Sequence, residues 1–345
     1  MRRTPTIVTA LAAAAAAASL LLTGCVAGEG SAAGSTSSSG VTEGGTLNID
    51  FATYNPLSLV IKKEGWLEKA LKKQGITVNW VQSAGSNKAN EALRSGAIDV
   101  GSTAGSAALL ARSNGSPIKT IDIYSQPEWS AIVVGPKSSI TSVEQLKGKQ
   151  VAATKGTDPY FFLLQSLEAN GLKASDVTIQ NLQHADGWAA LQNGSVDAWS
   201  GLDPIMANAQ KSGAKLIYRN VGFNTYGFLN ATESFLSSKP DVAQTVVNTY
   251  EYAREWAQKH PSDTAKILSD VAGIDLSVAT TVITERTNLD VSPVPGDAQL
   301  KVLTKVGPIF VQSGDVKSQA DIDKALDTLL DPDFVKKADP SAIGD

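Results

Sequence analysis

The spacing of apolar residues after residue 45 changes repeatedly between the period of a strand and that of a helix. Residues 47–52 alternate like a strand, and a helical pattern then runs to about residue 73, ahead of Gly75. Residues 76–81 again read as a strand. Because this order of strand, helix and strand continues along the chain, it predicts an α/β fold with mainly parallel sheets.

One unit of this pattern occurs twice. Residues 93–102 and residues 191–200 share four of ten positions, at a spacing of 98 residues. In each copy an amphipathic helix ends near a glycine, Gly96 or Gly194, which suits the left-handed conformation that follows a helix. A short strand comes next. We therefore predict two doubly wound lobes; the alternative is a chance similarity between two helix–turn–strand units of one ordinary domain.

The order of the elements predicts how the lobes are connected. Strands at 129–135 and 226–230 read as the two crossings between lobes, and helices follow to the end of the chain. Lobe 1 would hold residues 45–134 and 224–345, and lobe 2 residues 135–223. Ligands of doubly wound sheets bind beyond the carboxyl ends of the strands, so a cleft between the lobes is expected.

The N-terminal residues have the pattern of an export signal. Arg2 and Arg3 precede an alanine-rich apolar stretch at 7–22, shorter than a membrane span. The following Leu22-Thr-Gly-Cys25 resembles the lipobox of bacterial lipoproteins. That resemblance implies a signal peptide over 1–24 and lipidation of Cys25, with attachment to the extracytoplasmic face of the cell membrane. The alternative is an ordinary signal with an incidental cysteine.

The residues after Cys25 read as a tether. Residues 25–44 consist almost entirely of glycine, serine, alanine and threonine, which is typical of a flexible linker. We therefore expect a globular protein attached to the membrane through a lipidated leash.

Composition narrows the function further. The chain has 30 lysines and arginines against 34 aspartates and glutamates, without a basic cluster, so nucleic acid is not an expected partner. No apolar run after residue 25 reaches the length of a membrane helix. One cysteine and two histidines give no zinc-ligand spacing. We expect no metal and no cofactor.

Candidate catalytic groups are scarce. Gly101-Ser-Thr103-Ala-Gly105 has the spacing of a nucleophile elbow, but no histidine is placed to serve it. We therefore predict that the protein is not an enzyme and has no catalytic residues. The alternatives are an extracellular hydrolase that uses His184 and a structural surface lipoprotein without a small-molecule ligand.

Polar and aromatic residues gather in the loops that follow predicted strands. The polar set and its neighbouring tyrosine are Tyr54, Asn55, Ser102, Thr103, Thr157, Asp158 and Asp203. The aromatic residues that would wall the cleft are Trp129, Tyr160 and Tyr226. Helix N-termini behind these loops offer N–H groups to an anion. The structural alternative is helix capping for the polar residues and core packing for the aromatic ones.

Several stretches resemble the substrate-binding proteins of ABC importers, in the aliphatic sulfonate, taurine and nitrate branch that includes binders of thiamine-pyrimidine precursors. The matching stretches are residues 92–103, 146–156, 163–172 and 196–204. The resemblance implies a type II periplasmic-binding-protein fold whose lobes close on a small organic solute. It also implies a membrane permease as partner, and we expect a monomer.

Two positions depart from the sulfonate-binding members. Those proteins usually carry small hydroxyl residues where this chain has Asp158-Pro159, and tryptophan where it has Leu202. An ionised carboxylate about 5 Å from a sulfonate would repel it by roughly 3 kcal/mol at an effective dielectric near 20. We interpret Asp158 either as a cap of the helix that Pro159 begins, paired with Lys155, or as the partner of a donor-bearing ligand.

For the ligand we predict a small organic anion of the aliphatic sulfonate type. Its head group would lie on the helix N-termini behind Asn55 and Thr103, with aromatic residues against its organic part. Asp203 would accept a hydrogen bond from the ligand or latch the lobes together. The alternative is a neutral or cationic heterocycle, such as a thiamine-type pyrimidine precursor, which Asp158 and Asp203 would attract.

Overall fold

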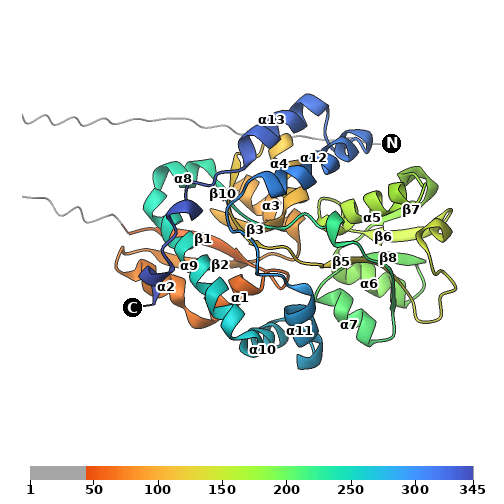
Figure 1. Cartoon of the computed structure of the whole chain (residues 1–345), viewed down its shortest axis with the longest axis horizontal. Coiled ribbons are helices and arrows are strands. Elements are labelled where there is room, and N and C mark those ends of the chain that lie inside the picture. The colour runs from red at the N-terminus through yellow and green to blue at the C-terminus, as the bar shows by residue number, and fades with distance from the viewer. Residues whose placement is uncertain (1–43, 345) are drawn as a thin grey trace, which may run out of the picture. The chain divides into compact units, whose positions relative to one another are not determined.

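The computed structural model describes residues 44–344. The predicted signal peptide, Cys25 and nearly all of the predicted tether lie outside the described residues. The described chain forms two five-stranded sheets with helices packed around them, and Figure 1 shows the two groups of strands. The predicted α/β class with two lobes is confirmed at the level of this two-sheet architecture.

The first sheet has the order β2-β1-β3-β10-β4. β1 pairs in parallel with β2 and β3, whereas β10 is antiparallel to β3 and β4. The strands are β1 (Thr46–Phe51), β2 (Thr77–Gln82), β3 (Val100–Ala104), β4 (Ile118–Ser125) and β10 (Gly227–Thr232). The helices between them are α1 (Pro56–Glu64), α2 (Trp66–Lys72), α3 (Ser86–Ser95) and α4 (Gly105–Ser113).

The second sheet has the order β7-β6-β8-β5-β9. β6 is parallel to β7 and β8, and β5 is antiparallel to β8 and β9. The strands are β5 (Ser130–Val134), β6 (Gln150–Ala153), β7 (Thr178–Asn181), β8 (Ala198–Leu202) and β9 (Lys215–Tyr218). The helices are α5 (Asp158–Ala169), α6 (His184–Gln192) and α7 (Ile205–Lys211).

The two sheets repeat one arrangement, and this corrects one predicted boundary. In each sheet the antiparallel strand, β10 or β5, lies between the third and the last of the other four. The prediction assigned residues 130–134 to lobe 1, but β5 pairs only with β8 and β9 of the second sheet. The first crossing therefore ends before β5, because β5 is already a strand of the second sheet.

The chain after β10 is helical. α8 (Glu233–Ser238) and the long α9 (Pro240–Lys259) are followed by α10 (Pro261–Ala272) and α11 (Leu276–Thr281). A π-helical turn at Val282–Arg286 leads to a loop, and α12 (Asp297–Gln312) and α13 (Gln319–Leu329) complete the set. In Figure 1, α9 lies beside the first sheet, α10 lies next to α1 and α11, and α12 and α13 lie next to α4.

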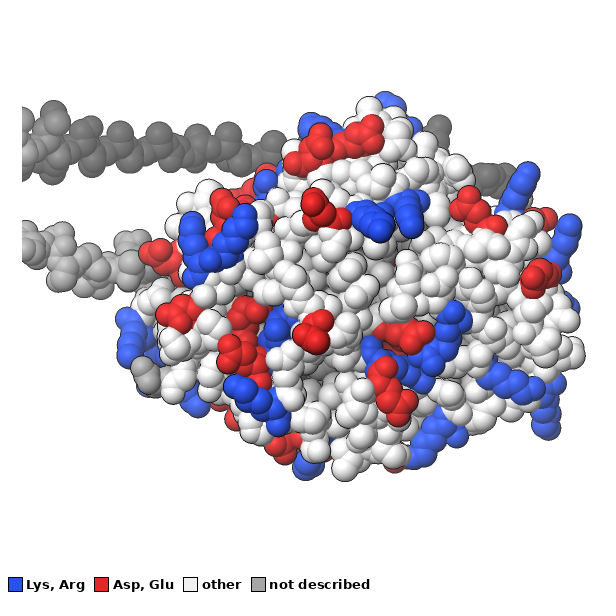
Figure 2. All heavy atoms as spheres, in the orientation of Figure 1, with Lys and Arg blue, Asp and Glu red and all other residues white. Residues whose placement is uncertain are grey.

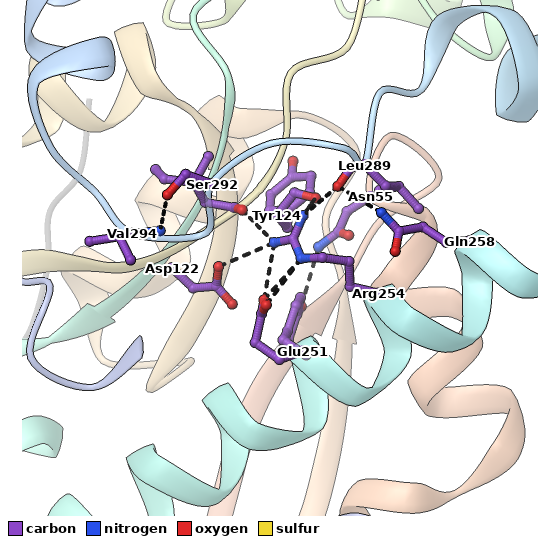
Figure 3. A network of polar contacts seen from close by, with 11 residues as sticks. Asn55, Asp122, Tyr124, Glu251, Arg254, Gln258, Leu289, Ser292 and Val294 are labelled. Carbon is purple, nitrogen blue, oxygen red and sulfur yellow. Dashed lines mark hydrogen bonds and ion pairs between the residues drawn. The ribbon is translucent and has the colours of Figure 1, made fainter. Parts of the chain in front are cut away.

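A buried arginine fixes the loop after the π-helical turn (Figure 3). Arg254, on α9, donates to both carboxylate oxygens of Glu251 at 3.1 and 3.2 Å. It also donates to the backbone oxygens of Tyr124 and Leu289 at 3.0 and 3.1 Å. A guanidinium with several oxygen acceptors is well satisfied when buried. This network ties β4, α9 and the loop around Leu289 together.

Glycines end helices where the sequence predicts it. Gly96 takes a φ of 73° at the end of α3, and its N–H bonds to the carbonyls of Ala92 and Leu93. Gly65, with a φ of 68°, divides the long helix predicted to residue 73 into α1 and α2. A residue with a Cβ would be strained in this left-handed conformation, so glycine allows the change of direction.

We call the first sheet with its helices, including those after β10, the first half of the molecule, and the second sheet with α5, α6 and α7 the second half. Apolar side chains pack between these two halves. Phe161 on α5 lies against Phe310 on α12, with ring centroids 4.3 Å apart. Both rings are buried and belong to a core cluster that includes strands of each sheet. Helix α5 thus contacts elements of the first half while it covers the second sheet.

Charged side chains are mixed on the surface. On the face shown in Figure 2, lysines and arginines alternate with aspartates and glutamates, without a broad patch of one sign. Within residues 44–344, no helix combines the length and apolar character needed to cross a bilayer.

Candidate functional site

Asp158 lies at the centre of the contact between the two halves, which we call the seam. One oxygen of its carboxylate accepts hydrogen bonds from the hydroxyls of Ser106 and Thr225, both at 2.6 Å. The other accepts from the Trp129 indole N–H at 2.8 Å and from the Thr225 backbone N–H at 2.9 Å. Ser106 belongs to α4. Trp129 lies in the connection from β4 to β5, which is the first crossing, and Thr225 lies in the connection from β9 to β10, which is the second. Three separate segments therefore meet at one carboxylate.

The surroundings of Asp158 are polar but contain no cation. The carboxylate is 1% exposed, and it forms no ion pair among the described residues. Burial raises the pKa of Asp158, and the hydrogen bonds from Ser106, Thr225 and Trp129 oppose that rise. The charge is therefore held by neutral donors alone, each contributing on the order of 1.5–3 kcal/mol as a hydrogen bond to a charged group.

The capping interpretation of Asp158 is wrong. Thr157, not Asp158, occupies the cap position of α5, and no side-chain capping bond forms there. The Thr157 hydroxyl donates instead to the Thr154 carbonyl at 2.6 Å. Lys155 forms no ion pair with Asp158 in the described part of the chain; its ammonium lies over the Tyr160 ring. The Asp158 side chain points across the seam because donors from the other half are available there.

Tyr54 and Trp129 meet next to this carboxylate. Their rings are 6.1 Å apart at an interplanar angle of 85°. The Tyr54 hydroxyl donates to the Ser102 carbonyl at 2.9 Å. Side chains fill the seam here, leaving a cavity of about 10 Å³ bordered by Tyr54, Trp129, Asp203 and Arg286.

Ser102 is occupied within the first sheet. Its N–H and its hydroxyl donate to the carboxylate of Asp50 at 2.8 and 3.0 Å. Burial raises the pKa of Asp50 to about 7, while the hydrogen bonds from Ser83 and Ser102 act in the opposite direction. Asp50 is a second buried acid that sequence analysis missed, because it lies inside an apparently regular strand.

Asn55 and Thr103 also have structural roles. Asn55 caps α1 by accepting from the Ser58 N–H, and its amide donates to the Tyr250 hydroxyl at 3.2 Å. The Thr103 hydroxyl donates to the Ala104 carbonyl and accepts from the Asn230 amide at 2.8 Å. Both side chains are fully buried, and the capping alternative therefore describes Asn55 correctly.

The N-terminus of α4 is not free, contrary to prediction. The Gly105 N–H bonds to the Tyr226 carbonyl at 3.1 Å, and the Ser106 N–H bonds to the Thr225 hydroxyl at 2.7 Å. The second crossing thus lies directly on the start of this helix. Tyr226 is held at a φ of 67°, which is unusual for a residue with a side chain and typical of a position fixed by its surroundings.

Asp203 forms an ion pair across the seam with Arg286. One nitrogen of Arg286 bonds to both Asp203 oxygens, at 3.0 and 3.1 Å, and both side chains are 4% exposed. Arg286 comes from the π-helical turn of the first half, whereas Asp203 follows β8 of the second sheet. Burial raises the pKa of Asp203 to about 6, against the lowering effect of Arg286.

Two predicted aromatic residues lie away from Asp158. Tyr160 borders a cavity of about 720 Å³ between α5 and α12, together with Leu164, Ile309 and Gln312. Tyr226 borders another, of about 390 Å³, near Gln126 and residues 291–299. The structure therefore brings Trp129 and Tyr54 together beside Asp158, whereas the side chains of these two tyrosines line other cavities.

His184 is buried in the seam without a charged partner. Its Nδ1 is 3.2 Å from the Thr154 hydroxyl, which donates its own hydrogen to the Leu182 carbonyl. Nδ1 must then carry the proton, and Nε2 is an acceptor that has no hydrogen-bond partner among residues 44–344. Nε2 faces Gly85 of the first half, where an added Cβ would lie 3.0 Å away. Burial lowers the pKa of His184 to about 4, so the ring is neutral.

Metal chemistry finds no support in this region. Among residues 44–344, no cluster of three histidine, cysteine, aspartate or glutamate side chains is arranged to hold a metal ion. What the seam provides is a set of hydrogen-bond donors around one anionic group.

Comparison with known proteins identifies the family of this chain. A family profile described as NMT1/THI5 like matches residues 59–264. The chain belongs to the NMT1/THI5-like family. One relative is a putative aliphatic sulfonates-binding protein of Bacillus subtilis, which is 30% identical over 83% of this chain and 85% of that protein. A second, from Escherichia coli, is 27% identical over 80% of the chain and 86% of its own length.

Solved structures show the same fold. The alkanesulfonate-binding protein of Xanthomonas axonopodis pv. citri bound to MOPS superimposes with a TM-score of 0.74 at 25% identity, covering 81% of this chain and 97% of its own. The periplasmic aliphatic sulphonate-binding protein of Escherichia coli gives 0.70 at 25% identity, over 83% of this chain and 92% of its own. A desulfurization enzyme, at 15% identity and a TM-score of 0.62, shares the fold alone.

The comparisons confirm the predicted family resemblance and fold. The NMT1/THI5-like chain shares its fold with periplasmic binding proteins, and the curated relatives are named for binding rather than for catalysis, as expected for a protein that is not an enzyme. Sequence reasoning missed Ser106, Thr225 and Arg286. A hydroxyl residue at the second position of α4 was a visible indication for Ser106, whereas nothing local marked the other two.

Proposed function

We propose that the protein is the extracytoplasmic solute-binding component of an ABC importer and that it captures a small organic anion of the aliphatic sulfonate type in the seam. The observation that carries this proposal is the convergence of four hydrogen-bond donors from three segments on one buried anionic group. A binding protein for an anion needs such neutral donors, arranged between parts that can separate.

The relatives support the chemical class. Two curated proteins that share most of their length with this chain are named for aliphatic sulfonates, and a third, matching 42% of it, is named for taurine. The heterocycle alternative gains nothing from the seam, since Asp158 already accepts four hydrogen bonds and Asp203 is paired with Arg286. Neither carboxylate is free to attract a cationic ring.

The lobes and the anchor are part of this proposal. Each sheet with its helices would act as one lobe, and release of the seam would admit the ligand, because the cavity of about 10 Å³ there is too small for any organic anion. Lipid on Cys25 would hold the protein at the outer side of the cytoplasmic membrane, next to its permease, and one copy would suffice for capture.

A thermal-shift screen tests the ligand class. The panel holds methanesulfonate, longer alkanesulfonates, taurine, nitrate and a thiamine-type pyrimidine. A ligand at 100 times its dissociation constant stabilises a folded protein by about 2.7 kcal/mol, which raises the melting temperature by several degrees. We expect this with at least one sulfonate.

A neutral isostere supplies the control. Dimethyl sulfone has nearly the shape of methanesulfonate without its charge, and it should leave the melting temperature unchanged. If the pyrimidine stabilises the protein and no sulfonate does, the sulfonate proposal is wrong. For any ligand that the screen identifies, calorimetry combined with product analysis should show stoichiometric binding without turnover.

A further inference from the structure

The donors around Asp158 are held in place by contacts that do not involve Asp158. The Thr225 hydroxyl accepts from the Ser106 N–H at 2.7 Å, so its own hydrogen has to point elsewhere, toward the carboxylate. The Thr225 N–H is fixed by the backbone of the second crossing, where the Tyr226 carbonyl accepts from Gly105. Trp129 is 3% exposed and is packed edge-on against Tyr54. We call Ser106, Trp129 and Thr225 the cradle.

A set of donors that is positioned independently of its acceptor is a binding site for any anion of suitable size. Here the acceptor is a side chain from the opposite half, at the first residue of α5. Its two oxygens take two donors each, which uses all the lone-pair positions of a carboxylate.

We propose that the cradle is the anion subsite of this protein and that Asp158 is its built-in occupant, which competes with the external ligand for the same four donors. The identity of that ligand rests on the proposed function, but the competition does not. A donor hydrogen serves one acceptor well, so an entering anion has to displace the carboxylate. Being tethered, the carboxylate competes as an intramolecular group, at a high effective concentration.

Displacement has a mechanical consequence. Ser106 belongs to a helix of the first half and Asp158 to a helix of the second, so an anion that replaces the carboxylate breaks a direct link across the seam. Asp158 thereby lowers the affinity for anions and closes the seam by itself. The opposing interpretation is that Asp158 is a permanent clamp: it keeps its hydrogen bonds across the seam at all times, and the ligand binds elsewhere.

Removal of the carboxylate distinguishes these interpretations. Asp158→Ala leaves the cradle without its occupant, and sodium acetate then serves as a probe that restores the missing group. We expect acetate to raise the melting temperature of Asp158→Ala and not that of the wild type at equal ionic strength. Methanesulfonate should bind Asp158→Ala at least tenfold more tightly than the wild type.

Second-site variants provide matched controls. In the Asp158→Ala background, Ser106→Ala should abolish the acetate effect, because one donor is lost, whereas Ser237→Ala on the exposed face of α8 should preserve it. A folded Asp158→Ala protein that responds to neither anion would overturn the proposal. Acetate rescue without sulfonate binding would leave the cradle standing and refute the proposed ligand class instead.

The wild type offers a test that does not depend on the variant folding. The indole N–H resonance of Trp129, assigned through Trp129→Phe, reports its hydrogen bond to Asp158. Titration with a sulfonate that calorimetry shows to bind should shift this resonance. Binding without any shift would mean that the ligand lies elsewhere and that Asp158 is a permanent clamp.

Discussion

Buried ionisable residues in and near the seam differ in whether a charged partner is present. Asp203 has Arg286, whereas His184 and Asp50 are surrounded by neutral groups. Burial lowers the pKa of His184 to about 4 and raises those of Asp50 and Asp203 to about 7 and 6. These shifts act on stability with opposite signs, because burial favours the neutral form of both residue types.

The sign for His184 leads to a prediction. The unfolded chain binds a proton to this residue below about pH 6.5, while the folded protein does so only below about pH 4. Stability is therefore lost as pH falls through that window, by about 1.4 kcal/mol per pH unit. Urea unfolding at several pH values should show that His184→Gln lacks this loss, so its stability relative to that of the wild type rises as the pH falls from 7 to 4.

The chain contains a matched control for this experiment. His260 is exposed and stacks on Trp256, so His260→Gln is the same substitution made outside the buried interior. At low pH, Asp50 and Asp203 make a rising contribution to the free energy of unfolding. This contribution is the same in the wild type and in both histidine variants, so it cancels in the comparison. Parallel curves for wild type and His184→Gln would refute the argument.

The Asp203–Arg286 pair gives a second prediction at this scale. Arg286→Gln leaves a buried carboxylate without its cation, which should lower the free energy of unfolding by about 3–5 kcal/mol at pH 7. Near pH 5 the loss should be smaller, because Asp203, with a pKa of about 6, is then mostly protonated. Adding Asp203→Asn should recover part of the loss.

A surface pair provides the comparison. Lys266 and Asp270 lie one turn apart on α10, 3.0 Å from each other and largely exposed. Lys266→Gln should cost no more than about 0.5 kcal/mol, since solvent screens such a pair. If Arg286→Gln and Lys266→Gln lower the free energy of unfolding equally, the Asp203–Arg286 pair contributes no more than a surface contact.

Among the secondary-structure elements, α4 begins in close contact with the second crossing. A Cβ added at Gly105 would lie 2.3 Å from the Thr225 carbonyl oxygen and 2.8 Å from the Phe228 ring. A backbone atom cannot move aside without shifting the crossing. Gly105→Ala should therefore destabilise the protein by about 1–3 kcal/mol, the usual cost of overpacking, in a urea titration.

Gly135 is the matched control for Gly105. It follows β5, has no positive φ, and an added Cβ there would meet nothing within 4 Å. Gly135→Ala should be neutral or stabilising by up to about 1 kcal/mol, because it restricts the unfolded chain. If Gly105→Ala behaves in the same way, the start of α4 is not held against the crossing.

The elements themselves were largely predictable, and their partners were not. Periodicity and glycine positions predict both series of strands and helices, because the formation of a single strand or helix depends on neighbouring residues. Apart from Ser130, the sequence of β5 is apolar, and it does not reveal which sheet the strand joins. Asp158 finds Ser106 and Thr225 across 52 and 67 residues, so local sequence pointed to a cap while distant donors determined its conformation.

Considered as a whole, the molecule places its cradle on the connections between the two sheets. Trp129 directly precedes β5, and Thr225 shortly precedes β10, so two of the three cradle residues lie on the crossings. Any change in the angle between the sheets changes the positions of these donors. In the proposed function, anion binding and movement of the lobes would thus be coupled through the same few residues.

The proposed membrane anchor depends on a different part of the chain, which allows the two functions to be separated. Cys25→Ser removes the thiol that would carry the lipid, and a protein without acyl chains has no stable hold on a bilayer. We expect this variant to move from the membrane fraction to the soluble fraction and from the detergent phase to the aqueous phase. Ser31→Ala, in the same segment, should remain with the membrane. Because every cradle residue comes after residue 105, Cys25→Ser should bind sulfonates as the wild type does, and a variant that stayed membrane-bound would refute lipidation at this cysteine.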